Sequence, residues 1–139
     1  MIEREIKKYL HGSSNIRDVV GNRIYQGRAI QNVQGALLIL RNITSERHYS
    51  LSEEVATKAS ILQIDAYDET AVKAYDLGEL VRNRLSGYTG AAGDITIYGS
   101  TIISERSNVE EPGNRGDRWV FVYSFDFELT HSQTSPTFA

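Results

Sequence analysis

The stretch WVFVYSFDFELT, from Trp119 to Thr130, alternates aromatic or aliphatic residues with mostly polar ones over its whole length. Successive side chains of a β-strand point to opposite faces of a sheet, so this alternation predicts a strand with one buried face and one solvent face. At about 3.3 Å per residue the strand would span roughly 35 to 40 Å. That is longer than a small domain needs, and its end can project from the subunit and be buried by a neighbour.

The other regular elements follow from hydrophobic spacing and from turn residues. Two amphipathic helices are predicted, one from Ile2 to Leu10 and one from Ala71 to Leu85, the second preceded by possible N-cap residues. Three more strands are predicted from apolar content, at residues 36–40, 61–67 and 95–103. Gly78 lies in the apolar stripe of the second helix and costs about 1 kcal/mol of helix propensity, which predicts a close approach of that helix to the sheet.

A further helical turn is predicted from Ile16 to Val20, after possible N-cap residues, and a short extended piece from Arg23 to Tyr25. The other segments are predicted as loops. The polar segment Thr44–Thr57 is interpreted as a loop or a loosely paired arm, and the glycine-containing segment Tyr88–Asp94 as a flexible turn. The charged segment Ser104–Arg118, with Pro112-Gly113 near its middle, is interpreted as an extended hairpin connection between the last two strands.

These elements predict an α+β fold. Its sheet would be mainly antiparallel and four-stranded, with two helices packed on one face, a long C-terminal strand and an extended hairpin. A chain of 139 residues with 40% hydrophobic residues is the usual size of one domain, which we place at residues 1–131. The last residues, 132–139, are expected to form a mobile or partner-ordered C-terminal tail.

Composition excludes several classes of function. The formal net charge is −3, so there is no overall basic field that would hold DNA by counterion release. The absence of cysteine excludes disulfides, thiolate catalysis and cysteine-ligated zinc. The first residues lack the continuous apolar core of a signal peptide, and no stretch approaches the length of a membrane span.

Candidate catalytic residues are few. The three histidines, His11, His48 and His131, are scattered, and we expect surface or capping roles for them; no cofactor or metal site is predicted. Asp126 and Glu128 share a face of the predicted strand at a separation that an acid and a base could use, but a solvent-facing role is favoured because they alternate with core aromatics. The sequence therefore predicts no enzyme.

Several segments together resemble one protein family. They are the opening helix, the segments NRIYQGRA (residues 22–29), ITSERHYSL (43–51) and LQIDAY (62–67), the helix end VRNRLSG (81–87) and the aromatic closing strand. In this order they resemble the siphophage tail-terminator or tail-completion proteins, also called head-tail joining proteins. The resemblance implies a structural virion protein that forms a ring, terminates the tail tube and joins it to the head connector.

The resemblance also implies partners. They would be further copies in a homohexamer, the tail-tube protein and the head connector or stopper protein, with DNA passing through the lumen without sequence-specific binding and with no membrane contact. The protein would be made in the host cytoplasm and located at the head-proximal end of the tail. Candidate interface residues lie in the charged hairpin: Glu105, Arg106, Glu110, Glu111, Arg115, Asp117 and Arg118.

Three alternatives remain at this point. Another phage joint component, such as a head-completion stopper or a tail-tube subunit, has the same size and composition. A small hydrolase or nuclease could use Asp126, Glu128 and one histidine. A regulatory binding module could hold a ligand between sheet and helices, although no convergent polar cluster supports it.

Overall fold

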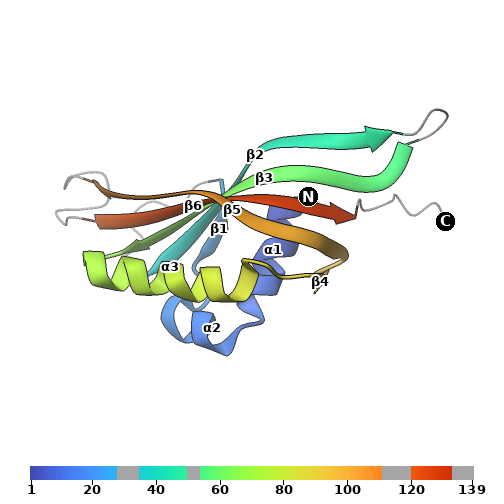
Figure 1. Cartoon of the computed structure of the whole chain (residues 1–139). Helices are drawn as coiled ribbons and strands as arrows, with labels where there is room; N and C mark the ends of the chain where they lie inside the picture. Colours follow the sequence, from blue (N-terminus) through green and yellow to red (C-terminus); the bar gives the residue numbers. More distant parts are fainter. Residues whose placement is uncertain (28–34, 50–53, 111–119, 133–139) are drawn as a thin grey trace.

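A computed structural model describes residues 1–27, 35–49, 54–110 and 120–132 (Figure 1). The chain forms three helices and six strands in these ranges. They are α1 (Ile2–His11), α2 (Ser14–Val20), β1 (Ile24–Gln26), β2 (Leu37–Tyr49), β3 (Glu54–Asp68), α3 (Ala71–Leu85), β4 (Gly90–Ala92), β5 (Ile95–Glu110) and β6 (Val120–Ser132).

The strands form one sheet in the order β1-β2-β3-β6-β5-β4. β1 runs parallel to β2, and every other neighbouring pair is antiparallel. Figure 1 shows a strongly twisted sheet with all three helices gathered on one side of it. We call that side the helix face and the other side the open face.

The predicted four-stranded antiparallel sheet with two helices is wrong: the sheet is mixed and six-stranded, and three helices cover it. The two additional strands, β1 and β4, have three residues each, too few for a hydrophobic period to be visible in the sequence. β1 overlaps the short extended piece that was expected at Arg23–Tyr25, although it was not assigned to the sheet. β4 lies where a flexible turn was expected. Only a partner strand makes these segments extended, as when Ile24 aligns with Leu38 and Ala92 with Ile95.

The third helix, α2, corresponds to a segment predicted only as a further turn. Its N-cap residue is Ser13, whose side-chain oxygen accepts a hydrogen bond from the Ile16 backbone N–H at 3.4 Å. Ile16 and Val20, one helical turn apart, are both buried. The helix thus forms because tertiary packing covers its two apolar residues.

Two long hairpins extend from the sheet, and Figure 1 shows them at opposite ends. In one, β2 and β3 pair as far as Tyr49 and Glu54, so the described parts of the segment predicted as a loop or a loosely paired arm, residues 44–49 and 54–57, are paired strands. In the other, β5 pairs with β6 up to Glu110 and Val120, so the first part of the predicted charged connection is strand. The long C-terminal strand is confirmed, because β6 has 13 residues.

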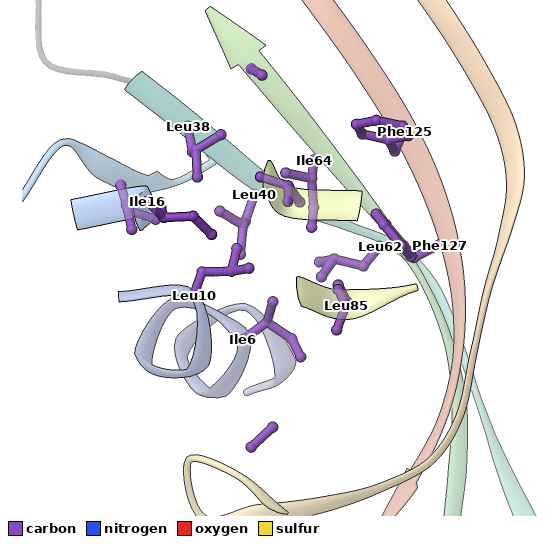
Figure 2. Close-up of a cluster of buried hydrophobic side chains, with 14 of the residues drawn as sticks. Ile6, Leu10, Ile16, Leu38, Leu40, Leu62, Ile64, Leu85, Phe125 and Phe127 are labelled. Carbon is purple, nitrogen blue, oxygen red and sulfur yellow. The ribbon is translucent and has the colours of Figure 1, made fainter. Parts of the chain in front are cut away.

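The main core lies between the helices and the helix face of the sheet. Figure 2 shows its centre, formed by Ile6, Leu10, Ile16, Leu38, Leu40, Leu62, Ile64, Leu85, Phe125 and Phe127. Gly78 of α3 confirms the predicted close approach: a Cβ there would lie 3.0 Å from Tyr123 Cδ1 and 3.1 Å from Phe125 Cε2. Helix α3 therefore rests directly on the aromatic rings of β6.

A second apolar cluster lies on the open face. It contains five buried residues from three strands: Leu37, Ile39, Tyr67, Val120 and Val122. These residues alternate along their strands with residues of the main core. The expectation that one face of the closing strand would be solvent-facing is therefore wrong at its beginning, where Val120 and Val122 are buried on the open face.

Candidate assembly surface

Polar side chains occupy the middle of the open face and are paired with one another. The Asp65 carboxylate is almost completely buried; it accepts hydrogen bonds from Gln63 Nε2 at 2.9 and 3.0 Å and lies 3.6 Å from Arg41 Nη1. Further along, Arg106 Nη1 lies 3.1 Å from Asp126 Oδ2. A buried carboxylate such as Asp65 needs such partners, so these contacts help to fix the strand register on this face.

Irregularities in the two outer long strands carry exposed apolar side chains. The pairing of β2 with β3 shifts at Ile43, and the pairing of β5 with β6 shifts at Tyr98 and again at Ile103. These three side chains are 55%, 53% and 49% exposed. A β-bulge re-aims a side chain, and large apolar groups held in solvent are typical of a contact surface.

A shallow groove of about 390 Å³ lies between the start of α3 and the β5–β6 hairpin. Its lining is mainly apolar: Ala71, Ala74, Ser107, Asn108, Val109, Phe121, Val122 and Tyr123. Tyr75 stands beside it, half-exposed, with its ring edge-on to the Tyr123 ring at 5.2 Å between centroids. The groove and the exposed Tyr98, Ile103 and Val109 place several apolar groups on the β5–β6 side of the molecule.

Two of the predicted interface residues, Glu105 and Arg106, are exposed on β5. Glu105 Oε2 accepts a hydrogen bond from the Tyr123 hydroxyl at 3.4 Å. Burial raises the pKa of Tyr123, and the negative charge of Glu105 acts in the same direction. Glu110 is the last residue of β5, whereas Glu111, Arg115, Asp117 and Arg118 lie outside the described residues.

Among the side chains that the structure describes, no histidine is brought together with the two carboxylates of the alternative catalytic site. Asp126 is paired with Arg106, and Glu128 is exposed; both alternate with the core residues Phe125 and Phe127 and so belong to the open face. His131 has the opposite parity on β6 and lies on the helix face. The favoured interpretation of the two carboxylates as solvent-side residues is confirmed.

His131 was expected to be a surface or capping residue and is instead buried. Its Nδ1 lies 2.8 Å from the Ser132 carbonyl oxygen, which can only accept, so Nδ1 carries the proton and Nε2 accepts from the Ser60 hydroxyl, also at 2.8 Å. Ser60 Oγ lies 2.9 Å from Ser45 Oγ. The chain of bonds joins β6, β3 and β2 at the base of the β2–β3 hairpin. It resembles a serine–histidine pair, but Ser60 is 1% exposed, so a substrate cannot reach the hydroxyl.

Protonation of His131 should weaken the fold. Burial lowers the pKa of His131, with Lys58 and the N-terminal charge acting the same way and the Ser132 carbonyl opposing. The unfolded state, with an ordinary pKa of about 6.5, then binds the proton more readily, so the free energy of unfolding should fall as pH is lowered from about 7 towards 5. Urea unfolding at several pH values measures this slope.

Replacement of His131 isolates this effect. His131→Gln should flatten the slope in that pH window, because glutamine does not titrate there. An unaltered slope in His131→Gln would show that another group causes the pH dependence.

Other kinds of site were sought in the described part of the chain. No group of three or more histidines and carboxylates there could hold a metal ion. No helix there has the length and apolar character needed to cross a membrane. The features that remain are the open face, the bulged residues, the groove and the two hairpins.

Comparison with known proteins gives a likeness of fold. No protein-family model matches the sequence, and no curated protein matches it. Among solved structures, the chain is similar to a protein of the "Virion of native gene transfer agent (GTA) particle", with a TM-score of 0.71 and 11% sequence identity. The similarity covers 95% of this chain and 95% of that one, so the two share one fold over their whole lengths.

Proposed function

We propose that this chain is a structural virion protein of a tailed bacteriophage or a phage-like particle. The observation that carries the proposal is the whole-length likeness of fold to a protein of a gene transfer agent virion. Because proteins of one fold can have many functions, the likeness of fold must be supported by the chemistry of the described residues. The described residues hold paired charges, an inaccessible serine–histidine contact and exposed apolar groups, which suit assembly better than catalysis.

More finely, we propose a ring that terminates the tail tube and joins it to the head connector. The order of sequence segments shared with tail-terminator proteins supports this role. Two hairpins that extend in opposite directions from one sheet also support it, because each can reach a different neighbour (Figure 1). A net charge of −3 suits a conduit wall that DNA passes without being held.

The proposed mechanism is recognition followed by capping. Docking of the ring on the last ring of tube subunits halts further addition, and the opposite side of the ring then offers a surface to the filled head. No covalent step is needed, so buried apolar area and polar complementarity supply the affinity. The groove beside α3 and the exposed Ile43, Tyr98 and Ile103 are the apolar groups available for these contacts.

Negative-stain electron microscopy of the purified protein tests this function. We expect single or paired rings with a central hole, and these should cap tubes of the purified tail-tube protein and stop their growth. Long stacks of rings would instead identify a tube subunit. A protein that stays monomeric at high concentration would contradict the proposal, as would a metal-dependent hydrolysis that Asp126→Asn abolishes without loss of folding.

A further inference from the structure

Both outer long strands of the sheet have edges without a neighbouring strand. β1 covers β2 only at Leu38–Leu40, and β4 covers β5 only at Ile95–Ile97. Within the described residues, no strand pairs with the outer edge of β2 from residue 42 to 49 or of β5 from residue 101 to 110. Such edges present rows of backbone donors and acceptors that can pair with another chain.

Two of the usual forms of protection against pairing are missing from these edges. Neither contains proline or lysine, the residues that most often block edge-to-edge contact. The bulges at Ile43 and Ile103 interrupt the edges, but they leave regular runs at residues 44–47 and 104–110. Val109, within the second run, is an exposed apolar residue.

We propose that the outer edge of β5 in one copy pairs with the outer edge of β2 in the next copy. The pairing would be antiparallel, with Asn108 opposite Thr44. The direction follows from the sheet itself: β2, β3, β6 and β5 alternate, so β2 and β5 run in opposite directions. A second copy added in the same orientation therefore continues the sheet with antiparallel pairing.

Charge complementarity selects this register. It aligns strand positions 46 and 47, which are Glu and Arg in the sequence, with Arg106 and Glu105. Arg106 would then lie between Asp126 of its own copy and Glu46 of the next. Ser45 then falls opposite Ser107. Continuing the count brings the exposed Ile43 beside the exposed Val109 at the end of the run.

The faces of the two strands agree in the same register. Thr44 pairs with Ile61 and Asn108 with Val122, and both of these partners alternate with main-core residues, so both positions belong to the open face. Ser45 pairs with Ser60 and Ser107 with Tyr123, which belong to the helix face. The helices of successive copies would thus lie on the same side of one continuous sheet.

Pairing of β5 with β5 of a second copy cannot both place opposite charges against each other and keep the helices on one side of the sheet. Glu105 and Arg106 lie on opposite faces because they are consecutive on a strand. A two-fold contact that keeps all helices on one side cannot place them opposite each other. The head-to-tail contact between β5 and β2 is heterologous, and such contacts close into rings when the rotation per subunit allows. Closure into a ring therefore rests on the proposed function, whereas the pairing of β5 with β2 and its register are new.

Cysteine crosslinking tests the register directly, because the chain contains no cysteine. In the full-length double variant Thr44→Cys/Asn108→Cys, the paired Cα atoms would lie about 4.5 to 5.5 Å apart, within disulfide range. We expect mild oxidation to give a ladder of covalent dimers and higher multiples on a non-reducing gel. Thr44→Cys/Ser107→Cys, shifted by one residue and therefore on opposite faces, should lose the ladder.

A charge reversal provides an independent test of the register. Arg47→Glu should weaken association by about tenfold in sedimentation, and Arg47→Glu/Glu105→Arg should restore it, because this exchange leaves the Arg106–Asp126 ion pair intact. Rings without the Thr44–Asn108 ladder would overturn the register and leave the proposed function standing. Crosslinking of Asn108→Cys alone would overturn the inference in favour of β5 self-pairing. A monomer with neither ladder nor rings would contradict the inference and the proposed function together.

Discussion

Replacing Phe125 with alanine should lower the free energy of unfolding by about 3 to 5 kcal/mol, the usual cost of removing a fully buried aromatic ring. Phe125 is completely buried on β6 and lies against the backbone of α3 at Gly78. Its ring centroid is 5.1 Å from that of Tyr123 and 5.7 Å from that of Phe127. Because α3 rests on this ring, its loss leaves a cavity that the helix cannot fill without moving.

Urea unfolding followed by circular dichroism measures this change, and the same strand offers a matched control. Phe121 is also a phenylalanine of β6, but it is only partly buried and lines the groove beside α3. Phe121→Ala should therefore cost well under half as much stability. Equal losses of unfolding free energy in the two variants would contradict the assignment of Phe125, and not Phe121, to the main core.

Replacing Gly93 with alanine should lower the free energy of unfolding by roughly 3 kcal/mol, from two separate causes. Gly93 has a φ of +57°, which strains any residue with a Cβ. The added Cβ would also collide with Glu5 Oε2 and lie 3.1 Å from Glu5 Cα. Glu5 is completely buried, and its Oε2 accepts a hydrogen bond from the Asp94 backbone N–H at 2.5 Å.

The collision matters because Glu5 joins α1 to the turn between β4 and β5. Displacing its carboxylate would separate a buried charge from the Asp94 N–H and disturb its contact with Arg4 Nε at 3.1 Å. Gly87→Ala is the control, since Gly87 has a φ of +73° and nothing lies within 4 Å of its added Cβ. It should cost only the backbone strain, about 1 to 2 kcal/mol. Identical losses in urea unfolding would rule out the steric part of the argument.

Glu5 was not among the sequence candidates, although its position carried a signal. It lies three residues after Ile2 and next to Ile6, on the apolar side of α1, where an acidic residue needs a buried partner. The partner is a backbone N–H almost ninety residues away in the chain. His131 and Ser60 show the same situation, since they lie 71 residues apart and meet only when β3 and β6 pair. Such partners cannot be read from one local stretch of sequence.

The sequence by itself determined the elements whose apolar period is long enough to be seen. These are α1, α3 with its N-cap at Thr70, and the core-facing half of β6, where Phe125, Phe127 and Leu129 alternate with polar residues. In each case a dozen or so residues favour one secondary structure, and the apolar side must be covered whatever the rest of the chain does.

Only the tertiary structure decided the extent of the sheet and the face that each residue occupies. β1 and β4 become strands by pairing with β2 and β5, and the polar segments 44–49 and 104–110 are extended because they pair with β3 and β6. The bulges at Ile43 and Ile103 likewise arise from register between strands. These features depend on hydrogen bonds between distant segments, which leave no period in the sequence, and they define the surface on which the proposed assembly depends.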